Sequence, residues 1–109
     1  MTVKDLCGKH GFTVLSMPDP DREVRGAYVG DLLSWVMGRA GADQVWITIM
    51  SNVNTVAVGS LSDVSLVLLA EGVTLPPDVL ETAKTRGVNV AVSPAPAFET
   101  ALAVAPDVV

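Results

Sequence analysis

Three short apolar runs, each followed by an amphipathic helix pattern, constrain the fold of this chain more than any other feature. The runs span residues 45–50, 64–70 and 88–92, and each closes on small or polar residues. Short apolar runs that alternate with helices indicate a parallel sheet built from strand–helix units. Because such sheets bind ligands beyond the carboxyl ends of their strands, the pattern predicts both a fold and a location for a site.

The size and composition suit one compact unit. The chain has 109 residues, of which 50% are hydrophobic and 17% charged, so it has ample material for one core. We expect a single three-layer α/β domain over residues 1–109, with a mainly parallel sheet of four to five strands and helices on both faces. A leading helix and strand would occupy residues 1–16, and the core would span about 22–105. The most apolar run, 64–70, would be the central strand.

The charge pattern excludes several partners. A formal net charge of −5, without a basic cluster, argues against nucleic acid and anionic membranes as partners. The longest apolar run, 64–70, is far shorter than the ~20 residues that span a bilayer. The start of the chain is too polar for a signal peptide, and Cys7 has no second cysteine to pair with. These features predict a cytoplasmic protein in which Cys7 is a small buried hydrophobic side chain.

Helix periodicity predicts which side chains face the core. The pattern at 31–40 leaves Trp35 off its apolar face and puts Asp31 where it would cap or complement the helix start. The next pattern starts at the predicted cap Asn52, and the last one ends at Pro106. The side chains expected to face inward are Leu32, Leu33, Val36, Met37 and Ala40 in the helix at 31–40, Val53, Val56, Ala57 and Leu61 in the helix that starts at Asn52, and Phe98, Ala101, Leu102 and Ala105 in the last helix.

No motif identifies a catalytic reaction. The chain lacks a P-loop, a Gly-x-Gly-x-x-Gly fingerprint and a Gly-x-Ser-x-Gly nucleophile elbow. Its single histidine and single cysteine cannot build a structural zinc site. We therefore expect no enzyme activity, no cofactor and no metal. An enzymatic role would gain support if Asp31 and Glu71 lay close together with a raised carboxyl pKa.

The candidate ligand-binding residues are those at the ends of the predicted strands. They are Gly30, Asp31, Ser51, Asn52, Asn54, Glu71, Gly72 and Ser93. Backbone N–H groups at helix starts attract anions, and a carboxylate after a strand is suited to accept a ribose hydroxyl or a proton. Each position also has a purely structural interpretation: a helix cap at Asn52, a solvated loop at Glu71 and a rigid turn at Ser93.

Several short segments between Arg22 and Leu102 carry a family resemblance. They are Gly26-Ala-Tyr-Val-Gly-Asp-Leu-Leu-Ser34, Trp46-Ile-Thr48, Val67-Leu-Leu-Ala-Glu-Gly72, Pro77-Asp-Val-Leu80, Gly87-Val-Asn-Val90 and Phe98-Glu-Thr-Ala101. Together they resemble the DRTGG domain family, which is named for two motifs at strand ends. At those motif positions this chain has roughly Asn52-Val53 in place of Asp-Arg, and Ala70-Glu71-Gly72 in place of Thr-Gly-Gly.

The resemblance implies a regulatory role. Domains of this family occur within some phosphotransacetylases and beside pairs of CBS domains, and they are similar to the amino-terminal domain of HPr kinase/phosphorylase. In these settings they accompany a catalytic or sensing domain. We expect a non-catalytic regulatory or ligand-binding module for a nucleotide or other small anion, and one that forms a homodimer. The alternative is a protein-interaction adaptor, with Trp35 in its homodimer or partner surface and no small-molecule ligand.

Overall fold

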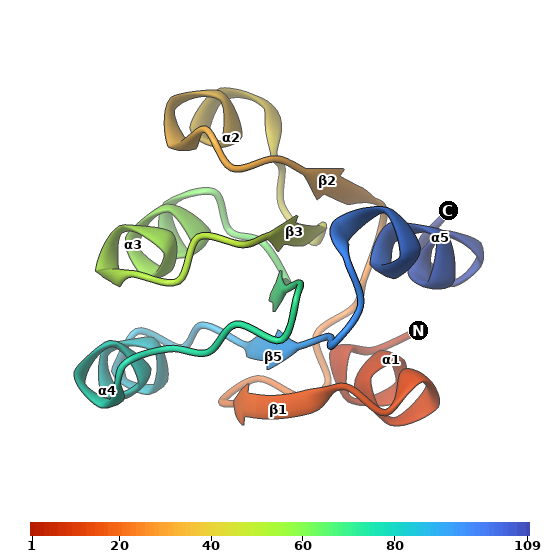
Figure 1. The fold of residues 1–109 in the computed structure, drawn as a ribbon, viewed down its shortest axis with the longest axis horizontal. Helices are drawn as coiled ribbons and strands as arrows, with labels where there is room; N and C mark the ends of the chain where they lie inside the picture. The colour runs from red at the N-terminus through yellow and green to blue at the C-terminus, as the bar shows by residue number, and fades with distance from the viewer.

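The computed structural model describes residues 1–109 and contains one five-stranded sheet with helices on both faces (Figure 1). The strands are β1 (Thr13–Ser16), β2 (Ala27–Val29), β3 (Val45–Thr48), β4 (Leu66–Leu69) and β5 (Val90–Val92). The helices are α1 (Val3–His10), α2 (Leu33–Arg39), α3 (Val53–Leu61), α4 (Pro77–Thr85) and α5 (Ala97–Val108). The predicted three-layer α/β fold is confirmed. None of the five helices has the length and apolar character needed to cross a membrane.

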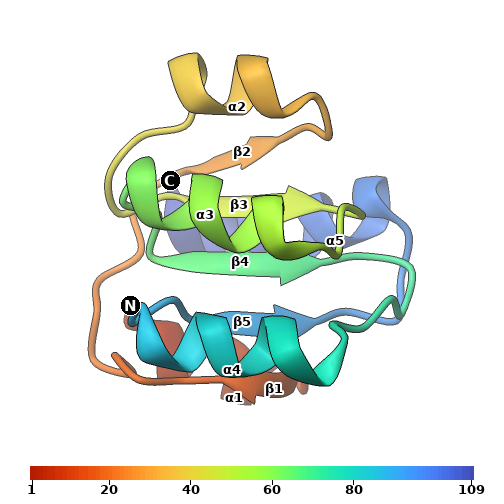
Figure 2. The ribbon, with the colours of Figure 1, turned by 90° about the vertical axis from the view of Figure 1, so that its left-hand side faces the viewer.

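The strand order is β1-β5-β4-β3-β2, so the most apolar strand, β4, lies at the centre as predicted. Strands β2, β3, β4 and β5 are mutually parallel, whereas β1 runs antiparallel to β5 and pairs Thr13 with Val92. A parallel sheet built from strand–helix units has all its carboxyl ends at one edge. Figure 2 shows the arrowheads of β2 to β5 pointing to that edge, which we call the strand-end edge.

Two apolar clusters hold the layers together. Helices α2, α3 and α4 cover one face of the sheet, and α1 and α5 cover the other (Figure 1). Successive strand residues alternate between these layers, since Trp46 belongs to the first cluster and Ile47 to the second. Trp46 is fully buried, and its indole N–H donates to the Gly30 carbonyl oxygen at 2.9 Å. The core therefore extends to the residues that follow β2.

The predicted inward faces of α2 and α3 are wrong in part. Leu32, Met37, Val53 and Leu61 are exposed, and only Val36 of α2 is fully buried. Helix α2 lies in the layer over the edge strand β2, so it has a neighbouring helix on one side only. In α3 the buried residues are Thr55, Val56, Val58 and Gly59, because the helix is rotated to bring Gly59 against β4.

The last helix also differs from the prediction. Phe98 and Leu102 are exposed, and the buried residues of α5 are Thr100, Val104 and Val108. Pro106 does not end α5 but lies inside its last turns. The burial of Val108, whose carbonyl oxygen also accepts a hydrogen bond from Gly26 N–H, offsets the bond that a proline cannot donate. The carboxyl end of the chain is thereby docked beside β2.

Candidate functional site

All the predicted site residues follow parallel strands and lie at the strand-end edge (Figure 2). Gly30 and Asp31 follow β2, and Ser51, Asn52 and Asn54 follow β3. Glu71 and Gly72 follow β4, and Ser93 follows β5. The four loops thus share one edge, but their side chains differ in hydrogen-bond partners and in exposure.

The carboxylate of Asp31 bonds to the end of β3 and does not cap α2. Its Oδ1 accepts hydrogen bonds from Thr48 Oγ1 at 2.7 Å and from the Ile49 N–H at 3.0 Å. The residue that precedes α2 is Leu32, which offers no side-chain cap. The expectation that Asp31 complements the helix start is therefore corrected: its bonds link the loops that follow two neighbouring strands.

The residues after β3 divide between a helix cap and an exposed side chain. Asn52 is the N-cap of α3, and its Oδ1 accepts from the N–H groups of Asn54 and Thr55. Thr55 Oγ1 in turn accepts from the Asn52 N–H, which completes a capping box. The capping prediction is confirmed. The Asn54 side chain is exposed and has no hydrogen-bond partner within the chain, and Ser51 is half-buried.

The loop after β4 adopts an uncommon backbone conformation. Glu71 and Gly72 both have left-handed backbones, with φ of 61° and 67°. Glycine adopts this conformation without cost, whereas a glutamate there is strained. Their N–H groups donate to the carbonyl oxygens of Ala95 and Ser93, at 2.8 and 2.9 Å, which clamps this loop to the one after β5. The Glu71 side chain is left exposed and free of internal hydrogen bonds.

Ser93 is buried and holds the loop after β5 in place through hydrogen bonds. It is 2% exposed, and its Oγ lies 2.8 Å from Thr100 Oγ1 and accepts from the Ala95 N–H at 3.2 Å. Its hydroxyl is therefore already occupied by the start of α5. Ser93 fixes the position of Gly72 and Pro94 through the backbone, rather than presenting a group to the solvent.

The two carboxylates considered as a catalytic pair lie on strands that are not neighbours. Asp31 follows β2 and Glu71 follows β4, and β3 runs between them. Strands are spaced by about 4.8 Å, so the two backbones are roughly 10 Å apart across the sheet. Asp31 is moreover held by Thr48. The geometry offers no shared proton between these carboxylates.

A cavity of about 310 Å³ opens at the strand-end edge beside β5. It is lined by Gly11, Thr13, Leu15, Gly72, Thr74, Val92 and Pro94. Only Gly72 of the predicted site residues contributes to this cavity. Thr13 and Thr74, the two side chains with hydroxyl groups, were missed by sequence reasoning. Thr13 reaches the site because β1 pairs antiparallel with β5, and no local pattern in the sequence signals that pairing.

Two helices begin close to this cavity without side-chain caps. The N-cap positions of α4 and α5 are Pro76 and Pro96, which cannot accept a hydrogen bond through their side chains. The first N–H groups of these helices therefore remain free, in contrast to those of α3. The first turns also carry Asp78 and Glu99, whose charges offset part of the positive helix ends. No lysine or arginine lines the cavity.

Ion pairs join the loops at the amino-terminal ends of the parallel strands. Arg22 donates to the carboxylates of Asp43 and Asp63, with Nη1 at 2.8 Å from Asp63 Oδ1, and also to the Asp63 carbonyl oxygen. The hydrogen bond to Asp63 raises the pKa of Arg22. Asp43 and Asp63 have left-handed backbones with φ of 67° and 57°, so these bonds stabilise two strained turns. No group of three or more His, Cys, Asp or Glu side chains is arranged to hold a metal ion.

No protein-family model matches the chain, and no curated protein matches it. Among solved structures, the chain is similar to the CBS and DRTGG domains of the regulatory region of Clostridium perfringens pyrophosphatase, complexed with the activator diadenosine tetraphosphate. The TM-score is 0.73 and the identity 14%, over 93% of this chain and 44% of that one. The likeness shows that the chain shares its fold with part of that structure. The chain spans less than half the length of that regulatory region.

Proposed function

We propose that the chain is a DRTGG-type regulatory module that binds a nucleotide or other small anion at the strand-end edge. The observation that carries the proposal is the 310 Å³ cavity formed where the loops after β4 and β5 meet the start of β1. Ligands of open parallel sheets bind at this kind of place. The pyrophosphatase regulatory region of similar fold was crystallised with a nucleotide activator, which supports the choice of ligand class.

The lining of the cavity suits the sugar and base of a nucleotide. The hydroxyls of Thr13 and Thr74 offer both donors and acceptors, and Gly72 allows close approach to the backbone. The free carboxylate of Glu71 lies beside Gly72 and is suited to accept a ribose hydroxyl. The volume is at the lower limit of ligand cavities, so one nucleoside-sized group would fill it.

The phosphates would lie outside the cavity, toward the uncapped starts of α4 and α5. Free N–H groups at helix starts bind anions through hydrogen bonds and the helix dipole. Because Asp78 and Glu99 lie in these first turns and no basic side chain lines the cavity, the base and sugar would contribute most of the affinity. A small anion without a nucleoside moiety would therefore bind more weakly than a nucleotide. The nucleoside moiety would thus be the main determinant of recognition.

A non-catalytic role agrees with what the polar groups near the cavity do. The buried hydroxyls of Ser93 and Thr100 bond to each other, and Asp31 bonds to Thr48. Neither arrangement pairs a free nucleophile with a base. Binding would instead change the relative position of the loops after β4 and β5, which are joined by the bonds from Glu71 and Gly72. Such a shift would be passed to a neighbouring domain or subunit.

Isothermal titration calorimetry with AMP, ATP and diadenosine tetraphosphate tests the proposal. The Thr13→Val and Thr74→Val variants keep the side-chain shape and remove the hydroxyl, so affinity should fall by about tenfold where a hydrogen bond is lost. Thr85→Val is the matched control, because Thr85 is exposed at the far end of α4. Equal affinity of all three variants, or no binding of any nucleotide by the native chain, would contradict the proposal.

A second candidate function, a homodimerising adaptor, is favoured by the outer surface of α2. Three large apolar side chains, Leu32, Trp35 and Met37, are 54–61% exposed on or just before this seven-residue helix. The Arg39 guanidinium stacks 3.9 Å from the centre of the Trp35 ring. Exposed aromatic and arginine side chains are enriched in protein interfaces. We infer that a second copy of this chain would pack here.

Light scattering coupled to size exclusion tests the adaptor function. Trp35→Ala should convert a dimer to a monomer, whereas Phe98→Ala, which removes an exposed aromatic residue from the opposite helical layer, should leave it intact. A native chain that is monomeric at high micromolar concentration would exclude this function. Retention of the dimer in Trp35→Ala would exclude α2 as its interface.

A further inference from the structure

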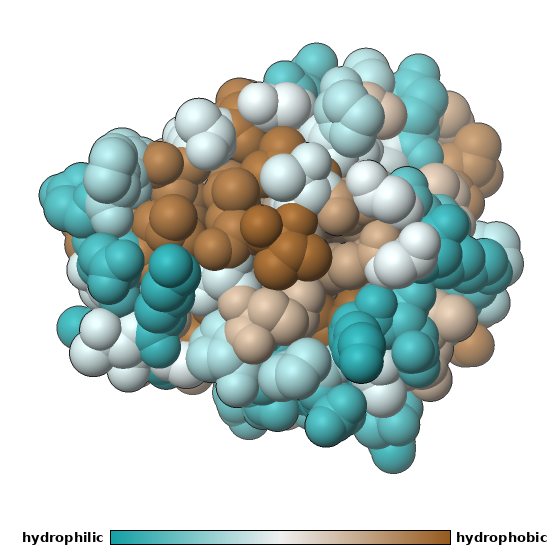
Figure 3. Space-filling model, turned by 90° about the horizontal axis from the view of Figure 1, so that it is seen from below, coloured by the Kyte–Doolittle hydropathy of each residue, from teal (hydrophilic) through white to brown (hydrophobic).

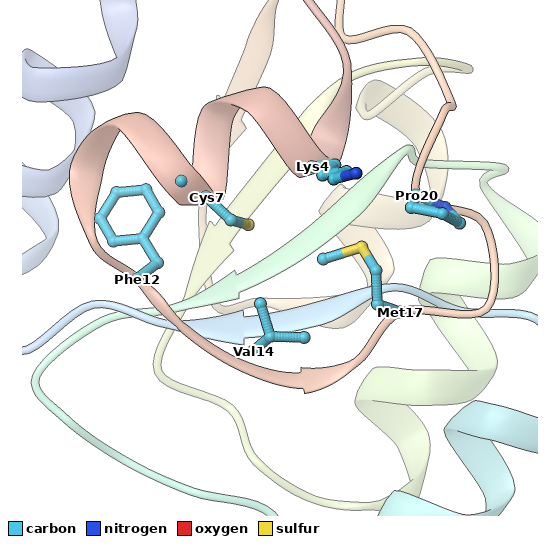
Figure 4. Close-up of a pocket in the computed structure, with 7 residues that line it drawn as sticks. Lys4, Cys7, Phe12, Val14, Met17 and Pro20 are labelled. Atoms are coloured by element: carbon cyan, nitrogen blue, oxygen red, sulfur yellow. The ribbon is translucent and has the colours of Figure 1, made fainter.

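A second cavity, of about 440 Å³, lies between α1 and β1 on the other side of the sheet from α4. It is lined by Lys4, Cys7, Gly8, Phe12, Val14, Met17 and Pro20. In Figure 4 the side chains of Cys7, Val14 and Met17 converge on the space between the helix and the strand, and Phe12 borders it. None of the residues that line the strand-end cavity contributes to this one.

Gly8 of α1 forms part of the cavity wall and has no side chain to occupy the space beside it. A Cβ atom added to Gly8 would meet no heavy atom within 4 Å, so the space beside it is open. The other wall belongs to β1, which is an edge strand of the sheet. Val14 of this strand is 47% exposed. Figure 3, viewed from the β1 side, shows apolar side chains gathered on this face among polar ones.

The walls are apolar apart from one cation. Burial raises the pKa of the Cys7 thiol to about 11, so at neutral pH the thiol is uncharged and contributes an apolar sulfur to the wall. The thioether of Met17 and the ring of Phe12 add soft, polarizable surface. The cavity is open to solvent on one side, and its volume is within the range of small-ligand sites.

Lys4 supplies the only charge in the lining, and it has no counter-ion in the chain. Its ammonium group makes no hydrogen bond or ion pair, whereas Lys9 bonds to Asp107 and Lys84 lies 3.8 Å from Glu81. The Lys4 side chain is exposed, so its unpaired ammonium group is available to an anionic group at the mouth of the apolar cavity. The lining thus combines an apolar interior with one positive group.

We propose that this cavity binds a monocarboxylate whose apolar body is a medium-length hydrocarbon chain. The apolar body would pack against Cys7, Phe12 and Met17, and the carboxylate would pair with the Lys4 ammonium. This site would be separate from the strand-end cavity and would be occupied independently of it. A ligand held between α1 and β1 would also brace the leading helix against the edge of the sheet.

Titration with octanoate, followed by amide NMR spectra and calorimetry, tests this inference. Octanoate should shift the amide signals of Gly8 and Val14 in a saturable manner, octan-1-ol should bind roughly threefold more weakly, and acetate should not compete. Gly8→Leu adds a bulky side chain to the cavity wall, with open space around its Cβ, and should weaken octanoate binding by about tenfold or more. Lys4→Gln should remove the difference between octanoate and octan-1-ol.

Two control variants show whether a loss of octanoate binding is specific to substitutions at the cavity. Gly38→Leu places the same side chain on another helical glycine with open space around it, and Lys84→Gln removes one positive charge at a distant site. Both should bind octanoate as the native chain does. The inference is overturned if Gly8→Leu binds octanoate with native affinity, if Lys4→Gln retains a preference for the carboxylate, or if acetate competes as well as octanoate.

Discussion

The Thr48 hydroxyl donates a 2.7 Å hydrogen bond to the Asp31 carboxylate, and this contact joins the end of β3 to the loop after β2. Thr48 is 1% exposed, and its Oγ1 also accepts from the Met50 N–H at 3.1 Å. One short chain of hydrogen bonds therefore links the loop after β2, the end of β3 and the loop after β3. A neighbouring pair of bonds, from Glu71 and Gly72 to the loop after β5, clamps the other half of this edge.

The contact between Asp31 and Thr48 should be visible as a coupling energy. Asp31→Ala and Thr48→Val should each destabilise the fold by about 1–2 kcal/mol, because each leaves a polar partner unsatisfied. The double variant should lose about 1 kcal/mol less than the sum of the two single losses. Urea unfolding at pH 7 measures all three variants. Strict additivity would show that the hydrogen bond contributes nothing in solution.

Asn52 and Asn54 form a matched pair that differs in structural role. Asn52→Ala should cost about 1 kcal/mol of stability, because it removes the capping acceptor of α3. Asn54 is exposed in the first turn of the same helix, so Asn54→Ala should change the stability by less than about 0.5 kcal/mol. Chemical denaturation compares the two, and equal losses would contradict the assigned capping box.

Close packing of α3 on β4 depends on Gly59. A Cβ atom there would lie 2.9 Å from Val67 Cγ2, so Gly59→Ala should destabilise the fold by about 1–3 kcal/mol. A Cβ atom added to Gly38, inside α2, would meet no heavy atom within 4 Å, so Gly38→Ala should stabilise by about 0.5–1 kcal/mol through helix propensity. Thermal unfolding should therefore shift in opposite directions for these two identical substitutions.

The contact between α1 and α5 should make stability depend on acid pH. Hydrogen bonds from Lys9 and then His10 lower the pKa of Asp107 below its ordinary value of 3.8. Because the folded-state pKa is the lower one, the contribution is fully present above about pH 4 and is lost as the pH falls through the folded-state value.

Melting temperatures of the native chain and of Asp107→Asn, measured between pH 2 and 7, test this dependence. The native chain should be the more stable at neutral pH, and the difference should disappear at the acid end. Asp21→Asn serves as a control, since Asp21 is exposed and makes no hydrogen bond or ion pair. A difference for Asp107→Asn that is constant with pH would refute the electrostatic contribution.

The sequence predicts the parts of the fold that depend on local patterns. Apolar runs locate the buried parallel strands, and Asn52 marks a helix start, because both signals arise from neighbouring residues. Leu32 was misassigned to the core because α2 is a short helix at the edge of its layer and buries only part of its apolar stripe. Val53 was misassigned because α3 is rotated to bring Gly59 against β4. Periodicity alone does not fix the rotation of a helix on its sheet.

The sequence predicts where a site would lie, but it does not predict which side chains line the cavity there. The strand-end edge follows from the parallel strands, and Gly72, one of the residues predicted for a site there, lines the cavity. Thr13 was not identified, because it reaches the cavity only through the antiparallel pairing of β1 with β5, a contact between segments far apart in the chain. Asp31 was identified, but its carboxylate is used by Thr48, a partner that no local pattern specifies.

Amide NMR spectra recorded during titration with AMP and with diadenosine tetraphosphate would test the central claim most directly. We predict saturable shifts centred on Thr13, Gly72 and Thr74, with little change at Gly8 and Val14 in the other cavity. No saturable shift with either nucleotide, or shifts centred on the Trp35 indole and α2, would contradict nucleotide binding at the strand-end edge.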